Sequence, residues 1–209
     1  MIVVLLHGLG RSQASMARLA ASLRAAGYRV ESLGYPSRRL GLAACAEHLR
    51  PALAAIRDRN EGPIVLIGHS MGGLVARHLA AADPAAGLVM LGTPNRGSEA
   101  ADLVSRFRLG RAVLGPALLD LRTGAAAAIP VPACPMAVVA GTRALIPFFH
   151  PWIARPHDGL VSLERARLGA GETWRTVPGH HTFLMDHPGT VQAVLEILSA
   201  WIPSAAQPG

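Results

Sequence analysis

The sequence contains no lysine, and all twenty of its basic residues are arginine. They outnumber the thirteen acidic residues, which gives a formal net charge of +7. The arginines are scattered, and the only local groups are Arg38-Arg39 and the set Arg106, Arg108 and Arg111. Aromatic residues, which stack on bases in nucleic-acid sites, make up only 4% of the chain. We therefore expect a solvated basic surface rather than a nucleic-acid-binding module, which stays as the alternative.

The sequence has only two cysteines, Cys45 and Cys134, and they lie far apart. Structural zinc sites take their ligands from closely spaced cysteine or histidine pairs, and that spacing is missing here. We expect two free thiols; a disulfide between them stays open but is not indicated. The nine histidines form no convincing metal-binding pattern, so we predict neither a metal nor a cofactor.

Long hydrophobic runs are also missing. The longest alanine-rich apolar stretch, residues 125–140, is interrupted by Pro130, Pro132 and Pro135, which makes it a poor membrane span. The N-terminal MIVVLLHGLG has no basic region before its apolar run and no cleavage site. It predicts a strand and not a signal peptide. We expect a soluble, cytoplasmic protein with no stable membrane span, and a cleaved precursor is the alternative.

Apolar residues dominate the chain: they make up 51% of it, against 16% charged residues. This proportion is typical of a folded protein and excludes a disordered polyelectrolyte. The 209 residues are enough for one substantial core, and the sequence shows no internal repeat and no linker. We therefore predict a single domain over residues 1–209.

Short apolar runs alternate with longer segments of helical periodicity. The runs predict six strands, at residues 2–6, 28–33, 64–67, 87–91, 136–140 and 173–177. The periodic segments predict helices at residues 12–26, 42–59, 71–82 and 190–202. Residues 96–124 predict a short insert of two helices separated at Gly110 or at Gly115-Pro116, and residues 147–158 predict a loop. Pro51 predicts a kink or a break near Leu49–Arg50.

Repeated strand–helix units define the fold class. They predict an α/β protein with a doubly wound, mostly parallel sheet of about six strands and helices on both faces. In such sheets, sites form outside the carboxyl ends of the strands. We therefore expect the chemistry in the residues that follow each strand.

The segment Gly68-His69-Ser70-Met71-Gly72 follows the third predicted strand and leads into a predicted helix. A turn this sharp imposes strained backbone angles on the serine and requires small residues two positions to either side. The hydroxyl is then held at the sheet edge, where the N–H of Met71 can meet a developing negative oxygen. We predict Ser70 as a nucleophile, and a tight glycine turn with an incidental serine is the alternative.

Other strand ends supply the remaining groups. His7-Gly8-Leu9-Gly10 follows the first predicted strand and offers the N–H of Leu9 as a second oxyanion donor. Serine is a poor nucleophile without a base, and His180 or His181 follows the last predicted strand. Asp158 is the best acid to orient the imidazole, because it gives the order nucleophile, acid, base along the chain.

Two further carboxylates, Asp102 and Asp120, are weaker alternatives for the acid. Both lie in the predicted helical insert rather than directly after a strand, where the chemistry is expected.

The sequence resembles the α/β-hydrolase superfamily, and within it the small bacterial serine lipases and esterases that lack a large lid. The segments that carry the resemblance span nearly the whole chain: HGLG at 7–10, GYPS at 34–37, GHSMGGLVAR at 68–77, LGTPNRGSE at 91–99, HDGLVS at 157–162 and HHTFLM at 180–185. In that group the histidine precedes Thr or Ser and then apolar residues, which favours His181 over His180. The resemblance also implies that His69 packs beneath the serine turn and that residues 93–98 form pocket wall.

Residues and resemblance together predict a serine hydrolase that cleaves carboxylic esters, with a small-molecule ester or lipid-like substrate. Ser70, Asp158 and His181 would form the triad, and the N–H groups of Leu9 and Met71 the oxyanion hole. The apolar residues of the insert would form a small cap beside an acyl pocket, or else pack as ordinary helices. An acyltransferase or thioesterase with the same triad is the alternative. A non-catalytic binding protein on this fold is less favoured, because no triad member is missing.

Overall fold

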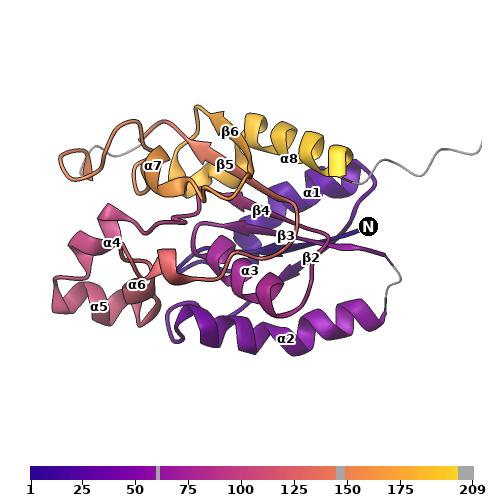
Figure 1. Ribbon diagram of the computed structural model, residues 1–209, viewed down its shortest axis with the longest axis horizontal. Helices are drawn as coiled ribbons and strands as arrows, with labels where there is room; N and C mark the ends of the chain where they lie inside the picture. The colour runs from indigo at the N-terminus through magenta and orange to yellow at the C-terminus, as the bar shows by residue number, and fades with distance from the viewer. Residues whose placement is uncertain (60–61, 145–148, 202–209) are drawn as a thin grey trace, which may run out of the picture.

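The computed structural model describes residues 1–59, 62–144 and 149–201. Its centre is one six-stranded sheet in the order β2-β1-β3-β4-β5-β6, and every neighbouring pair is parallel (Figure 1). The strands are β1 Ile2–Leu6, β2 Arg29–Leu33, β3 Ile64–His69, β4 Gly87–Leu91, β5 Met136–Gly141 and β6 Thr173–Val177. All six predicted strands are present, and only some of their ends are shifted.

Helices cover both faces of the sheet, as predicted (Figure 1). One face carries α1 (Ala17–Ala25), preceded by the turn η1 (Gln13–Met16), and α8 (Pro188–Trp201). The other face carries α2 (Leu42–Asp58) and α3 (Met71–Ala82). Every residue of β1, β3 and β4 is buried, which explains why these strands, apart from His69 at the end of β3, are continuous apolar runs rather than alternating ones.

The strand order changes direction between β1 and β3. From β1 the chain moves outward to β2, then crosses back to β3 and continues through β4, β5 and β6. Open α/β sheets bind ligands at such a switch point, outside the carboxyl ends of the strands. The segments that leave β1 and β3 there are the glycine-rich 7–10 and the serine turn 68–72.

The helix α2 runs without a break from Leu42 to Asp58, so of the two alternatives predicted near Leu49–Arg50 the break is wrong and the kink stays a prediction. Pro51 removes one N–H donor from the helix, but Leu49 lies before it and Leu53 and Ile56 after it on one buried face. Packing of both halves against the same core holds the helix together through the proline.

The predicted insert contains three short helices rather than two: α4 (Glu99–Val104), α5 (Arg108–Leu114) and α6 (Ala117–Asp120). Gly110 lies inside α5 and separates nothing, whereas Gly115, with φ +79°, ends α5. The boundary that was not expected is the turn between α4 and α5. Figure 1 shows the three helices grouped together at one end of the molecule; we call them the cap.

Smaller elements were not predicted. A short helix, α7 (Leu163–Ala166), follows residues 157–162, and the turn η4 (His181–Asp186) follows β6. Of the predicted loop at 147–158, the first two residues lie outside the described residues, and 149–158 carry no α-helix and no strand. Residue 202 of the predicted last helix also lies outside the described ranges.

Two expectations from composition concern the thiols and the membrane. Cys45 and Cys134 are free in the structure, as expected. Among the helices of the described ranges, none has the length and hydropathy that crossing a bilayer requires.

Candidate active site

Ser70 lies between β3 and α3 with φ 53° and ψ −124°. It is the one non-glycine residue with a positive φ in residues 1–59, 62–144 and 149–201. Backbone hydrogen bonds hold it there: its N–H donates to Leu91 O at 2.8 Å, and its carbonyl accepts from Gly73 N at 3.0 Å. Strain of this kind costs about 1–3 kcal/mol and is retained at functional sites when the surrounding structure enforces it.

The glycines on either side make the turn possible. A Cβ on Gly68 would lie 2.3 Å from the carbonyl carbon of Gly72, and a Cβ on Gly72 would lie 2.4 Å from the carbonyl oxygen of Leu6. Both contacts are with backbone, which cannot rotate away. This is the steric reason for small residues that the sequence pattern predicted.

Gly68→Ala is expected to lower the free energy of unfolding by about 3 kcal/mol or more, because the added methyl overlaps backbone atoms. Urea denaturation measures the loss. Gly124→Ala is the matched control: Gly124 has φ +86° but nothing within 4 Å of the added Cβ, so we expect only the left-handed backbone cost of about 1–2 kcal/mol. Equal losses in the two variants would contradict a steric origin.

The three side chains predicted as a triad lie in one chain of hydrogen bonds. His181 Nδ1 lies 2.7 Å from Asp158 Oδ2, and His181 Nε2 lies 2.9 Å from Ser70 Oγ. An ionised carboxylate can only accept, so Nδ1–H donates to Asp158. This tautomer leaves Nε2 unprotonated, and it accepts the hydroxyl proton of Ser70. The arrangement can therefore take a proton from the serine.

The carboxylate of Asp158 is buried and held on its other oxygen by backbone. The N–H groups of Leu160 and Val161 donate to Oδ1 at 3.0 and 2.8 Å. The backbone N–H of His181 also donates to the carbonyl of Asp158, at 2.9 Å. These bonds leave Oδ2 facing the imidazole and fix its position relative to the loop.

The other histidine after β6 points elsewhere. The ring of His180 packs edge-on against Phe183, with ring centroids 5.3 Å apart. Within the part of the chain that the structure describes, no hydrogen bond joins His180 to Ser70 or to Asp158. His181 is therefore the histidine within reach of the hydroxyl.

The alternative acids do not approach His181. Asp102 accepts from the N–H and the hydroxyl of Thr123, at 3.0 and 2.6 Å. Asp120 accepts from the N–H of Leu42 at 2.8 Å and so connects the cap to the start of α2. Both carboxylates thus make hydrogen bonds within or next to the cap, and these contacts explain their presence without a role as the acid.

His69 was expected to pack beneath the serine turn, but its hydrogen-bond partner was not expected. It is fully buried, and its Nε2–H donates to the carbonyl oxygen of His181 at 2.9 Å. Burial, and then the nearby His181, lower the pKa of His69 to about 3. The ring is therefore neutral at physiological pH, and it fixes the backbone of the residue whose side chain faces Ser70.

The loop that carries Leu9 is held by the segment GYPS. The hydroxyl of Tyr35 donates to His7 O, and the N–H of Gly10 donates to Ser37 Oγ at 3.0 Å. The rings of His7 and Tyr35 stack with centroids 4.2 Å apart, and burial lowers the pKa of His7. The motif was visible in the sequence, but its partner across 28 residues was not.

A cavity of about 330 Å³ opens beside Ser70. Leu9, Ser70 and His181 line it together, so three predicted site residues face one space. The rest of its wall is mainly apolar and comes from the cap and from the segment after Asp158: Ala100, Ala101, Val104, Leu114, Leu118, Leu121, Leu160 and Val161. The apolar cap residues Phe107, Leu109 and Val113 are instead exposed. The cap is thus divided: α4 and α6 face the cavity, whereas α5 reaches it with its last residue, Leu114, and has no buried residue.

Groups of three or more His, Cys, Asp or Glu side chains that could hold a metal ion do not occur among residues 1–59, 62–144 and 149–201. The hydroxyl of Ser70 is instead hydrogen-bonded to the imidazole of His181, which in turn is hydrogen-bonded to the carboxylate of Asp158.

Solved structures resemble this one across nearly its whole length. The mature form of Bacillus licheniformis lipase BlEst2 superposes with a TM-score of 0.79 at 19% identity, covering 94% of this chain and 91% of that one. The metagenomic carboxyl esterase MGS0156 gives a TM-score of 0.73 at 18% identity, covering 97% of this chain and 76% of that one. At such identities the likeness establishes the fold alone.

Curated relatives match over shorter stretches. The probable esterase PIR7A of Oryza sativa subsp. indica is 38% identical over 78 residues, 34% of this chain and 30% of that protein. Lipase LipV of Mycobacterium tuberculosis is 58% identical over 43 residues, 19% of this chain and 16% of that protein. The matches thus span about a third or less of the relatives' own lengths.

A family-level match covers nearly all of the sequence. Residues 3–207 match the sequence model described as the alpha/beta hydrolase family. The matched range includes every segment that carried the resemblance, and the six-stranded parallel sheet with its serine turn between β3 and α3 agrees with it. The chain therefore belongs to the alpha/beta hydrolase family.

Proposed function

We propose that the protein is a serine hydrolase that cleaves carboxylic esters through an acyl-enzyme on Ser70. The observation that carries the proposal is the chain of hydrogen bonds from Ser70 Oγ through His181 to Asp158. Ser70 and His181 line a mainly apolar cavity. An acid–base pair behind a hydroxyl is the arrangement that acyl transfer needs.

In the first half of the reaction, Ser70 Oγ attacks the ester carbonyl while His181 Nε2 takes the hydroxyl proton. Asp158 holds the imidazole in the required tautomer and stabilises the imidazolium that forms. His181 then gives the proton to the leaving alkoxide, which departs as the alcohol. The ester C–O bond breaks and the acyl group stays on Ser70.

The negative oxygen of the tetrahedral intermediate needs two donors, and we assign them to the N–H groups of Leu9 and Met71. Met71 is the first residue of α3, and N–H groups in a first helical turn have no partner within the helix. Leu9 lines the cavity at the end of the adjacent strand β1. The hydrogen bonds of Tyr35 and Ser37 support this role because they hold its loop.

In the second half, a water molecule attacks the acyl carbonyl and His181 again takes the proton. The acid is released and Ser70 recovers its hydroxyl proton from His181. Each step uses only the chain's own groups, the ester and water, so the mechanism we propose has no cofactor.

The mainly apolar cavity supports an ester with an uncharged acyl chain of medium length. Its volume of about 330 Å³ lies at the small end of ligand sites, which span ~300–1,000 Å³. The relatives and solved structures named as esterases and lipases are consistent with a substrate of this class.

Purified protein is expected to hydrolyse p-nitrophenyl esters with a rate that depends on acyl length. Each added methylene buried in the cavity contributes about 0.8 kcal/mol, so kcat/KM should rise roughly fourfold per carbon until the cavity is full. We expect kcat/KM to rise from acetate to octanoate and to fall for palmitate. Initial rates over the ester series measure the profile.

Ala101→Phe is the matched variant, because Ala101 lines the cavity from α4 and is not one of the residues proposed to carry the chemistry. It should lower the ratio of octanoate to acetate turnover. A ratio unchanged in this variant would place the acyl chain elsewhere, and no ester hydrolysis at all would contradict the proposed function.

A further inference from the structure

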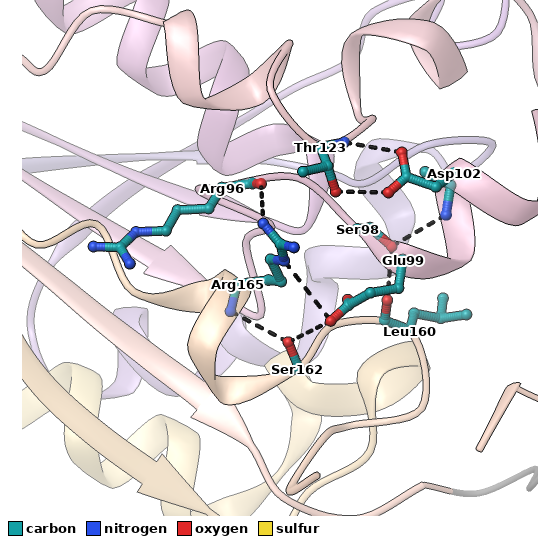
Figure 2. Close-up of polar contacts among 9 residues, drawn as sticks. Arg96, Ser98, Glu99, Asp102, Thr123, Leu160, Ser162 and Arg165 are labelled. Carbon is teal, nitrogen blue, oxygen red and sulfur yellow. Dashed lines mark hydrogen bonds and ion pairs between the residues drawn. The ribbon is translucent and has the colours of Figure 1, made fainter. Parts of the chain in front are cut away.

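The segments that follow the neighbouring strands β4 and β5 are joined by two side-chain hydrogen bonds (Figure 2). The reaction proposed above uses neither of them. Ser98 Oγ donates to the carbonyl of Leu160 at 2.7 Å. Ser162 Oγ donates to Glu99 Oε1 at 2.8 Å. The start of α4 is thus tied at two points, Leu160 and Ser162, to the short segment that begins at Asp158.

That segment, residues 158–162, is the one that holds the acid; we call it the acid loop. The N–H groups of Leu160 and Val161 donate to Asp158 Oδ1, and the side chains of the same two residues line the cavity. The position of the carboxylate is therefore set by the path of the loop backbone. Anything that fixes Leu160 and Ser162 also fixes the direction of Asp158 Oδ2.

Burying the carboxylate of Glu99 has a desolvation cost that a purely structural contact between the two segments would not require. Its side chain is only 16% exposed, and its one ion pair among the described residues is with Arg165, Nε to Oε1, at 3.8 Å. Its second oxygen, Oε2, is buried with no hydrogen-bond partner in the described part of the chain. A neutral side chain could pack here at lower desolvation cost.

The geometry at Ser162 shows what the carboxylate achieves. The hydroxyl of Ser162 has one proton, which it gives to Glu99, while its oxygen accepts the N–H of Arg165 at 3.3 Å and caps α7. Glu99 therefore orients a buried hydroxyl at the junction of the acid loop and α7. Figure 2 shows Glu99 reaching from α4 to Ser162 and Arg165.

We propose that Glu99 is a positioning residue for Asp158: through Ser162 it holds the acid loop against α4, so that Asp158 Oδ2 stays on Nδ1 of His181. This role rests on the proposed function, since it matters only if His181 works as a base. Glu99 touches neither the substrate cavity nor the reacting atoms, and it acts through the loop.

The test compares Glu99→Ala with Glu99→Gln. Alanine removes the acceptor for Ser162, and a loosened acid loop should lower kcat on p-nitrophenyl butyrate by on the order of tenfold to a hundredfold, with little change in KM. Glutamine keeps an acceptor oxygen and should restore most of kcat. The low-field proton resonance of His181 Nδ1–H should broaden in the alanine variant and persist in the glutamine variant, a signature that a loss of stability alone does not produce.

Asp102→Ala is the matched control, because Asp102 is a second carboxylate on α4 but binds Thr123 instead of the acid loop (Figure 2). It should leave kcat and the low-field resonance unchanged. Ser162→Ala removes the same hydrogen bond from the other side, together with the side-chain cap of α7. It should lower kcat at least as much as Glu99→Ala, and the double variant should be no worse than Ser162→Ala.

Wild-type kcat and an intact resonance in Glu99→Ala would overturn the positioning role. If that variant does not fold, Ser162→Ala decides: a folded variant with unchanged kcat overturns the proposal, and one with the lowered kcat and broadened resonance supports it. Failure of the proposed function would be recognised by a different result: Ser70→Ala would keep its activity, irrespective of the results with the Glu99 variants.

Discussion

Ser70→Ala is expected to lower kcat for p-nitrophenyl butyrate by about a thousandfold to a millionfold. Without the hydroxyl, no acyl-enzyme forms, and water must attack the ester in a cavity that still binds it. A fluorophosphonate should add covalently to the wild-type chain at Ser70 and should not label the variant. Initial rates and mass spectrometry of the labelled protein measure the two effects.

Two further substitutions separate chemistry from folding. Ser199→Ala removes an exposed hydroxyl on α8 and should keep the full rate. Ser70→Gly should be as inactive as Ser70→Ala but more stable by about 1 kcal/mol, because glycine accepts the φ of 53° without strain. Substantial ester hydrolysis by either Ser70 variant would contradict the assignment of Ser70 as the nucleophile.

His181→Ala is expected to lower kcat by on the order of a thousandfold or more, because no base remains to take the Ser70 proton. His180→Ala should change kcat by a few-fold at most, because its ring packs on Phe183 and lies outside the chain of hydrogen bonds. The comparison uses one substrate, with the fold of each variant checked by circular dichroism.

The pair of histidine variants forms its own control, since the residues are adjacent and of one type. A chain that keeps its rate without His181 but loses it without His180 would show that the base was assigned to the wrong ring. Loss of rate in both folded variants would mean that η4 must be intact before either ring can act.

Much of the fold could be predicted because buried parallel strands leave a strong signal. In β1, β3 and β4 every residue is buried, so each strand appears as an apolar run, with His69 at the end of β3 as the exception. The cap left a weaker signal. The helix α5 buries none of its residues, and Gly110 inside it looked like a boundary although it serves a close contact: a Cβ there would lie 2.5 Å from the carbonyl oxygen of Val104.

The residues of the candidate site were visible because strand ends of a parallel sheet gather at one edge. Ser70, Asp158 and His181 were each chosen for following a strand or its loop, and their side chains lie within hydrogen-bonding distance. Their catalytic roles stay predictions. The choice between His180 and His181 needed the family resemblance, since one sequence cannot say which of two adjacent rings turns inward.

What the sequence could not supply is the partners of polar side chains far apart in the chain. Ser162 and Glu99 are separated by 63 positions, and His69 and His181 by 112. Periodicity records which face of an element is buried but not which donor meets which acceptor. Those pairings depend on loop paths that only the assembled sheet determines.

His69 ends β3, directly before Ser70, and its hydrogen bond fixes the backbone of His181. The proposed nucleophile and base are thus both held by the end of β3, which we call the mount, whereas much of the cavity wall is formed by the helices of the cap. Heating should therefore increase the motion of the cap before it increases the motion of the mount. As temperature rises, discrimination among acyl chains should fade before turnover of the smallest esters does. Divergence should follow the same division, with new substrates acquired through the cap while the mount is left unaltered.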